Sequence, residues 1–359
     1  MTLLTPSDIA PDFLLLDQAG KKVALYGRRL SGRPLVLGFG GKAGDVAPLI
    51  ALLREGSPRL DAANIGVVVV DRETDAANAA LSERYDIVFP LLSDADGRVS
   101  DMYGIAVPTL ILLNHNFRVV AVLRPRPGED VVGEIVDRIA EAVPAIEPRE
   151  IGIQAPVLLI PDVLERDYCR RLIDQWESGG NRQSGFMRTV GDVSKELHDP
   201  SIKKRRDHYL SDPAIKRILE QNLERRVVPE IAKAFNFRVT RLEDLRIVCY
   251  DSQTGGYFRH HRDNISPGTA HRRWAMTLNL NTDEYEGGHL RFPEYGPHLY
   301  RPPTGSAVVF SCSLLHEAMD ITAGRRFVLL SFLFGEADER RREAYRRKVG
   351  KVDKVGKVG

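Results

Sequence analysis

The first third of the chain alternates short apolar runs with segments of helical composition. The apolar runs predict buried strands at 34–39, 65–70, 109–113 and 118–122. Helical segments are expected at 47–53, 75–85 and 131–143. Strands that alternate with helices are typical of a three-layer α/β domain. The polar turn Asn114-His115-Asn116 joins the last two strands and predicts an antiparallel hairpin at one edge of the sheet.

The pattern changes in the second half. Two long amphipathic stretches, 162–176 and 212–235, predict helices. From Leu245 onward, turn residues separate a series of short apolar strands at regular spacing, which is typical of an all-β sandwich or barrel. The expected fold is a double-stranded β-helix, or jelly roll, with buttressing helices.

A polar segment with proline near both ends, 144–149, indicates the boundary between the two patterns. We therefore expect four regions. They are an α/β domain over 1–145, a linker over 146–153, a jelly-roll domain over 154–336 and a charged tail over 337–359, which we expect to be disordered beyond a short helix.

Composition narrows the class of protein. With 359 residues, 43% hydrophobic and 28% charged, the chain has the size and composition of two globular domains. The net charge of +2 favours no nucleic-acid partner. Three scattered cysteines, no signal-peptide pattern and no apolar run of about 18 residues predict a cytoplasmic protein without a membrane partner. The sequence leaves a homo-oligomer open.

Candidate chemistry is concentrated in the strand-rich half. His261 and Asp263 form a His-x-Asp pair, and alternate residues of a strand point to the same face. His316, from a later strand, could complete a set of two imidazoles and one carboxylate. Such a set holds iron(II) on one face and leaves positions open for oxygen chemistry. A lone His-x-Asp pair is common by chance, so the motifs around it decide its weight.

Those motifs occur in a specific order. Tyr250 ends a strand, a Gly-Gly turn precedes His261, a Gly-Gly-His-Leu-Arg-Phe strand follows, and Arg326 stands ten residues after His316. Over about 154–336, this order resembles the prolyl-4-hydroxylase-like branch of the 2-oxoglutarate/Fe(II) dioxygenases. One departure is His289, which occupies a position where that family usually has an acid.

The resemblance implies a set of roles. His261, Asp263 and His316 would bind Fe(II). Arg326 would bind the distal carboxylate of 2-oxoglutarate, with Tyr250 as a second ligand of this cosubstrate. Arg325 is expected to face the other way on the strand. O2 is the second cosubstrate, and ascorbate is a candidate activator. Related halogenases have Gly or Ala in place of the carboxylate, so Asp263 favours hydroxylation. The substrate, a protein or peptide residue or a small molecule, stays open.

The first domain resembles peroxiredoxins of the thioredoxin fold over about 6–143. The motifs Ala10-Pro-Asp-Phe, Asp94-Ala-Asp-Gly and Val107-Pro-Thr carry this resemblance. Peroxiredoxins need a cysteine at the start of the first long helix, and the corresponding segment here, 44–47, reads Gly-Asp-Val-Ala. Because thiolate is the nucleophile of that chemistry, peroxidase activity is excluded. We expect a domain retained for docking or stability.

Two alternatives to a hydroxylase remain. The segment 38–43, Gly-Phe-Gly-Gly-Lys-Ala, follows a strand and matches a dinucleotide-binding fingerprint, which would suit a nicotinamide-dependent oxidoreductase. The chain could also be a binding or scaffold protein with an inactive oxygenase domain. The complete His-Asp-His set and Arg326 speak against the second alternative.

Overall fold

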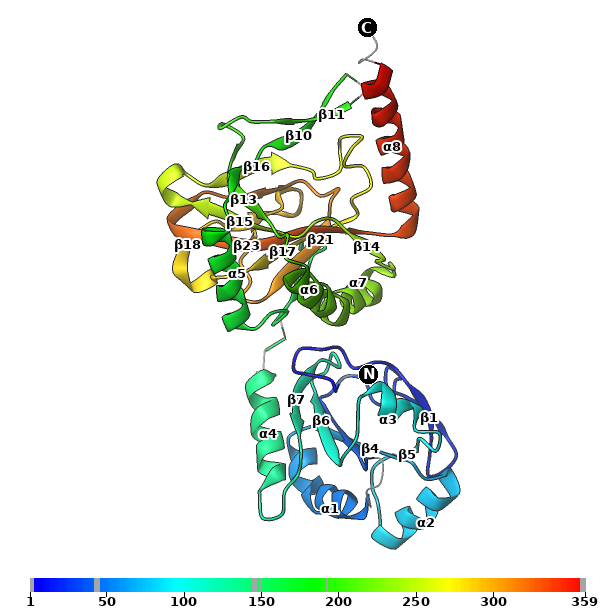
Figure 1. Cartoon of the computed structure of the whole chain (residues 1–359). Helices are drawn as coiled ribbons and strands as arrows, with labels where there is room; N and C mark the ends of the chain where they lie inside the picture. The colour runs from blue at the N-terminus through cyan, green and yellow to red at the C-terminus, as the bar shows by residue number, and fades with distance from the viewer. Residues whose placement is uncertain (1–2, 42–45, 144–146, 149, 192, 356–359) are drawn as a thin grey trace. The chain divides into compact units, whose positions relative to one another are not determined.

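The computed structural model describes residues 3–41, 46–143, 147–148, 150–191 and 193–355 (Figure 1). The chain divides into two compact units, Met1–Pro148 and Arg149–Gly359, each with its own apolar core. Among the described residues, no helix combines the length and apolar composition needed to cross a bilayer.

The N-terminal unit is a thioredoxin-like domain built on one seven-stranded sheet. The sheet has the order β2-β1-β5-β4-β3-β6-β7. Its strands are β1 (Leu14–Asp17), β2 (Lys22–Ala24), β3 (Leu35–Phe39), β4 (Gly66–Asp71), β5 (Leu91–Ser93), β6 (Thr109–Leu113) and β7 (Val119–Leu123). The helices are α1 (Ala47–Ala62), α2 (Asp75–Tyr85), α3 (Arg98–Met102) and α4 (Val131–Ala142).

Alternate side chains of the central strand β3 enter two different cores. Leu35 and Leu37 pack on the face that carries α3, whereas Val36 packs with residues of α1 and α4 on the other face. This arrangement is the expected three-layer architecture. Strand β6 runs antiparallel to β3 and pairs with β7 in a hairpin, so the sheet is not the doubly wound sheet of a dinucleotide-binding domain. Residues 42–45, which hold part of both motifs discussed above, lie outside the described residues.

Two facing sheets form the C-terminal unit. The larger has the order β8-β21-β17-β23-β15-β13-β9, with β14 and β18 paired to β23, and the smaller has the order β12-β16-β22-β19-β20. The strands of the larger sheet are β8 (Leu158–Ile160), β9 (Arg182–Gln183), β13 (Arg206–Tyr209), β14 (Arg241–Leu242), β15 (Arg246–Asp251), β17 (Trp274–Asn279), β18 (Tyr285–Gly287), β21 (Ala307–Ser311) and β23 (Ile321–Phe334). Those of the smaller are β12 (Lys203–Lys204), β16 (Tyr257–His261), β19 (Leu290–Arg291), β20 (Leu299–Tyr300) and β22 (His316–Ala318). A separate hairpin comprises β10 (Phe186–Val190) and β11 (Val193–Leu197).

The larger sheet has a core on each face. On its outer face, Ile247 and Leu329 pack against the helices α5 (Arg166–Ser178), α6 (Pro213–Arg226) and α7 (Val228–Phe235). On its inner face, Val248 and Val328 pack with Phe258 and Ala318 of the smaller sheet. The helices therefore buttress a jelly roll, as the sequence predicted, and the space between the sheets is left for the site.

Two expectations were wrong in detail. The single helix expected over 212–235 is two helices, which meet at Val227. Pro229 has no N–H to continue the hydrogen bonding of the first helix. It stands instead in the first turn of the second helix, where proline is tolerated. The tail was expected to be disordered beyond a short helix, but it forms the long helix α8 (Glu336–Val355). Residues 356–359 lie outside the described residues. Arg273 pairs with Asp338 at 2.8 Å and the Tyr345 hydroxyl accepts a hydrogen bond from Ser194 N at 2.8 Å, so tertiary contacts hold this helix.

Candidate active site

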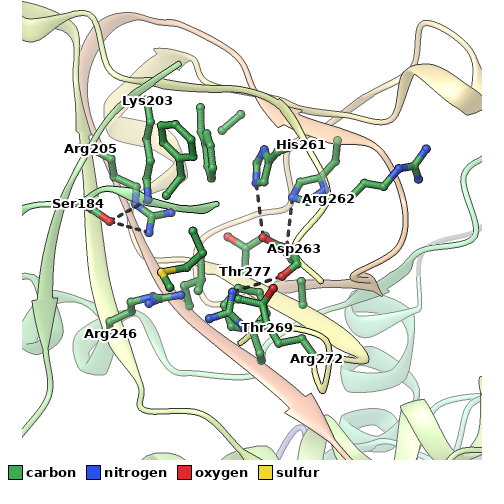
Figure 2. A pocket seen from close by; sticks show the side chains of 18 of the residues that line it. Ser184, Lys203, Arg205, Arg246, His261, Arg262, Asp263, Thr269, Arg272 and Thr277 are labelled. Carbon is green, nitrogen blue, oxygen red and sulfur yellow. Dashed lines mark hydrogen bonds and ion pairs between the residues drawn. The ribbon is translucent and has the colours of Figure 1, made fainter. Parts of the chain in front are cut away.

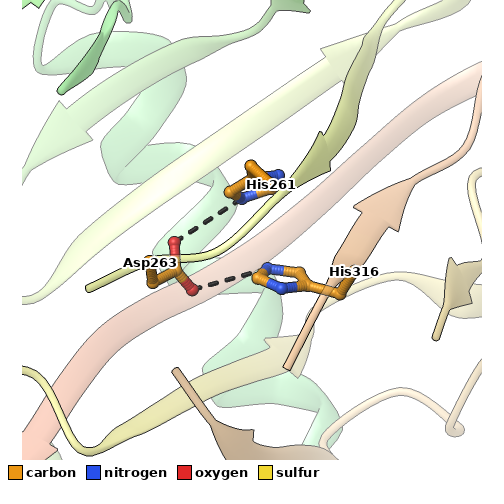
Figure 3. Close-up of side chains that lie close together, drawn as sticks. All are labelled: His261, Asp263 and His316. Atoms are coloured by element: carbon orange, nitrogen blue, oxygen red, sulfur yellow. Dashed lines mark ion pairs between the residues drawn. The ribbon is translucent and has the colours of Figure 1, made fainter. Parts of the chain in front are cut away.

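The His-x-Asp pair and the distal histidine come together between the two sheets (Figure 3). His261 ends β16 and lies opposite His316 of β22 in the register of the smaller sheet. Asp263 lies just past the end of β16, where its N–H donates to the Cys312 carbonyl at 2.9 Å. One potential ligand atom from each of these three side chains lies within 4.8 Å of the others.

Both imidazoles are oriented by their own backbone. His261 Nδ1 lies 2.7 Å from the Arg259 carbonyl, and His316 Nδ1 lies 3.0 Å from the Leu314 carbonyl. A carbonyl oxygen only accepts, so each Nδ1 carries the hydrogen and each Nε2 presents a lone pair. Such outer hydrogen bonds are typical of histidines that bind metals. The two Nε2 atoms face the Asp263 carboxylate at 3.5 and 3.4 Å.

The donor set fits a divalent cation. Two donors about 2.1 Å from one octahedral ion stand roughly 3 Å apart, close to the observed nitrogen–oxygen separations. Burial alone would raise the pKa of Asp263, but His316 and His261 outweigh it and hold that pKa well below its usual range. Burial, and next the neighbouring His261, lowers the pKa of His316 to about 4. At neutral pH these two groups are thus already in the form that binds a metal.

The triad lies in the wall of a cavity of about 560 Å³ (Figure 2). Its lining includes side chains from the inner faces of both sheets and from the β10–β11 hairpin. Eight lysines and arginines but only four acidic residues line it. Three of these cations, Arg205, Arg262 and Arg342, pair with acidic residues outside the lining, so the net positive charge of the cavity is modest.

Arg326 and Tyr250 lie side by side in this cavity. They face each other across β15 and β23, and both side chains are almost completely buried. Arg326 Nη2 donates to Asn279 Oδ1 at 3.2 Å, while its Nε has no hydrogen-bond partner among the described residues. A buried guanidinium with a free donor is suited to a carboxylate brought in by a ligand. Arg325 points out of the cavity and pairs with Glu177 at 2.8 Å.

A second basic cluster lines the cavity, and the sequence analysis did not identify it. This cluster consists of three cations that line the cavity: Lys203 on β12, Arg205 between β12 and β13, and Arg246 at the start of β15. All three side chains are largely buried. Both oxygens of Asp207 accept from Arg205, at 2.7 and 2.8 Å. In the sequence, Lys-Lys-Arg-Arg at 203–206 resembles a stretch of solvent-exposed charges. In the structure, burial alternates along this stretch: Lys203 and Arg205 are buried, and Arg206 is exposed.

Arg272 is a fourth cation that sequence reasoning missed. Its Nε and Nη2 donate to the two oxygens of Glu243 at 2.7 and 2.9 Å, and its Nη1 lies 3.4 Å from the Asp263 carbonyl. His271 also contacts Glu243, with 2.8 Å between Nε2 and Oε1. This neutralised cluster braces the loop that carries Asp263.

Comparison with known proteins agrees with this geometry. Residues 245–334 match the family model described as the 2OG-Fe(II) oxygenase superfamily, and residues 6–122 match that of the AhpC/TSA family. A PKHD-type hydroxylase of Acinetobacter baumannii is 28% identical over 186 residues, covering 47% of this chain and 73% of the relative. A PKHD-type hydroxylase of Caulobacter sp. is 25% identical over 180 residues, covering 47% and 74%. A prolyl-4-hydroxylase structure from Pseudomonas putida aligns with a TM-score of 0.37 and 17% identity, covering 50% of this chain and 92% of that one.

The fold and the family match define the C-terminal unit as an oxygenase domain of the jelly-roll class. More narrowly, it is a 2-oxoglutarate-dependent hydroxylase domain, and it follows an AhpC/TSA-type domain in the same chain. This superfamily uses Fe(II) as its metal cofactor and 2-oxoglutarate and O2 as cosubstrates.

Proposed function

We propose that the chain hydroxylates an unactivated C–H bond of a small molecule or of a protein or peptide residue. One atom of O2 enters the new hydroxyl group. The other enters the succinate formed as 2-oxoglutarate is oxidised and loses its C1 carboxyl group as CO2. His261, Asp263 and His316 would hold the iron, and when bound, Fe(II) would supply the redox chemistry that activates O2.

The residues around the metal ligands would bind the cosubstrate and position Asp263. Arg326 offers its free Nε to the distal carboxylate of 2-oxoglutarate, and the buried Tyr250 ring lies beside it, 5.6 Å from the guanidinium carbon. The Tyr250 hydroxyl already accepts from Arg205 at 3.3 Å, which leaves its own hydrogen for the cosubstrate. The Glu243–Arg272 cluster keeps Asp263 in place while these ligands bind.

One observation carries the proposal. Three metal-ligand side chains and a buried arginine with an unsatisfied donor open into the same cavity. An inactive scaffold would have no need to maintain a buried, unpaired guanidinium, which costs stability. The N-terminal sheet topology removes the basis for the nicotinamide alternative.

We further propose that the N-terminal domain docks substrates or stabilises the hydroxylase rather than acting on peroxides. No cysteine precedes Cys169 in the sequence, so the domain has no thiolate nucleophile. Its separate core is compatible with such a supporting role.

The direct test is succinate release by the full chain with Fe(II), 2-oxoglutarate and O2, with and without ascorbate. We expect a slow background rate that a substrate stimulates, and equal amounts of succinate and hydroxylated product in the stimulated reaction. A screen over amino acids, peptides and cell extract identifies that substrate. Failure to bind 2-oxoglutarate in the presence of Mn(II) would refute the proposed function.

A further inference from the structure

The basic cluster of Lys203, Arg205 and Arg246 carries more positive charge than its surroundings neutralise. Arg205 donates to both oxygens of Asp207. Arg246 Nη1 donates to the uncharged Tyr209 hydroxyl at 2.9 Å, whereas its Nε lies 3.9 Å from the Asp207 carboxylate and has no hydrogen-bond partner among the described residues. Lys203 Nζ donates to the Ser184 hydroxyl at 2.8 Å and to the Gly185 carbonyl, both uncharged acceptors. Two buried cations and the partly buried Arg246 thus have one carboxylate, that of Asp207, within 4 Å among the described residues, an arrangement that is costly unless an anion completes it.

The cosubstrate does not complete it. The distal carboxylate of 2-oxoglutarate is assigned to Arg326, which lies opposite Tyr250. Arg246 stands four residues before Tyr250 on β15, which is about 13 Å along the strand, and faces Leu330 instead. The side chains of Arg326 and Arg246 therefore start from positions about 13 Å apart along the strand pair. Arg205 reaches toward the cosubstrate end, where it donates to the Tyr250 hydroxyl at 3.3 Å, so we assign only the region around Lys203 and Arg246 to a second anion.

That second region is close to the metal ligands. Lys203 Nζ lies 4.7 Å from the centre of the Phe258 ring, and this ring stacks on His261 with 3.4 Å between centres. Figure 2 shows Lys203, Arg205 and Arg246 on one side of the cavity and His261 and Asp263 on the other. In a substrate whose anionic group binds this cluster, the atom that faces the metal would be only a few bonds away from that group.

We propose that the substrate of this hydroxylase is anionic, with a carboxylate or phosphate group that Lys203 and Arg246 bind a few bonds from the hydroxylated carbon. This inference rests on the proposed function and adds the class of substrate to it. Burial, and next the neighbouring Arg205, lowers the pKa of Lys203. A bound anion opposes both effects, so it stabilises the ammonium form.

The first test uses inorganic sulfate as the probe. The full chain, loaded with Mn(II) and 2-oxoglutarate so that Arg326 is occupied, is titrated with sulfate by calorimetry. We expect one saturable site in the wild type and at least a tenfold weaker one in Arg246→Met and in Lys203→Met. Arg325→Met, an exposed arginine beside the cavity arginine, is the matched control and should bind like the wild type. Absence of a site in the wild type, or equal binding in all variants, overturns the proposal.

The second test identifies the anion. Succinate release is measured with pairs of compounds of which one member carries an anionic group and the other does not: aspartyl against asparaginyl peptides, and phosphoseryl against seryl peptides, with the corresponding capped amino acids. Stimulation by the charged member of a pair alone supports the proposal, and the pair concerned distinguishes carboxylate from phosphate. Equal stimulation by the neutral member overturns it, although succinate release itself would still uphold the proposed function.

Stability separates a binding role of Lys203 from a structural one. If its charge awaits an anion, Lys203→Met should raise the melting temperature of the ligand-free protein, because a buried charge without an ionic partner is removed. If Lys203 instead serves to hold Ser184 and Gly185, the variant should melt at a lower temperature, and its role in substrate binding is refuted. The dissociation constant of 2-oxoglutarate, measured on the same samples, shows whether the rest of the site is intact.

Discussion

The two domains bury charged side chains in different ways. In the N-terminal domain, Asp94 is 1% exposed and accepts hydrogen bonds from the N–H groups of Val99 and Ser100, at 2.9 and 2.7 Å, and from the Ser100 hydroxyl. Its charge stabilises the start of α3. In the C-terminal domain, Arg326 and Lys203 are buried without a carboxylate partner among the described residues.

A buried charge that is fully hydrogen-bonded within its own domain stabilises the fold. A buried charge without an ionic partner is instead available to a ligand. Both domains match families of enzymes, yet only one retains the groups that the chemistry needs. All three cysteines of the chain lie in the C-terminal unit, and burial raises the pKa of Cys169 and Cys249 to about 12. Family resemblance is thus a guide to fold in both domains, whereas the His-Asp-His set and the cavity arginine distinguish the one with a reaction.

Loss of a metal ligand should produce the largest effect. We expect His316→Ala to abolish Mn(II) and Fe(II) binding and turnover, a loss greater than the about 10–100-fold that follows removal of an outer partner of a ligand. Metal binding is measured by calorimetry and turnover by succinate release. His298→Ala is the control, since His298 is exposed and lies outside the cavity. Full activity of His316→Ala would remove this histidine from the metal set.

Removing the cavity arginine should have the next largest effect. Taking a charged partner from a buried carboxylate costs about 1.5–3 kcal/mol, which is roughly tenfold to a hundredfold in binding. Arg326→Ala should therefore weaken 2-oxoglutarate binding by that factor, and Arg325→Ala should leave it unchanged. The dissociation constant of 2-oxoglutarate, measured for both variants with Mn(II) present, checks this expectation. Equal effects in the two variants would show that the cosubstrate binds elsewhere.

Removing the N-terminal domain should have the smallest effect on the metal centre. A fragment of residues 149–359 keeps the three metal ligands and Arg326, so decarboxylation of 2-oxoglutarate without substrate should persist at a similar rate. Hydroxylation of the true substrate should fall if the domain presents it. A fully active fragment would contradict the docking role, and an insoluble fragment would indicate that the domain supports folding.

Much of this architecture could be predicted from local patterns. Helix α2 and strand β6 have the predicted bounds, because a helical composition and an unbroken apolar run are strong signals. The hairpin β10–β11 was missed because most of its residues are exposed, so no apolar alternation indicates strands. The tail helix is longer than expected because the contacts of Asp338 and Tyr345 that hold it come from residues distant in sequence.

The candidate site also has one part that local sequence patterns predict and one part that depends on the folded structure. His261, Asp263 and His316 could be selected because their motifs occur in order, and the opposite orientations of Arg325 and Arg326 follow from strand alternation. The cluster around Lys203 could not be selected in this way. Its significance depends on the number of carboxylates nearby, and within the described part of the chain only Asp207 supplies one at hydrogen-bonding distance. Charge balance inside a cavity is a property of the folded chain.

The short hydrogen bonds from each imidazole to the carbonyl two residues earlier have a thermodynamic consequence. They are local to the strands, so backbone carbonyls rather than a bond to a metal set the orientation of each ring. We therefore expect folding and metal uptake to be separate equilibria, unlike those of a zinc finger, which needs its ion to fold. Chelators should leave the domain folded. Each tenfold excess of free cation over its dissociation constant should add about 1.4 kcal/mol to the free energy of unfolding.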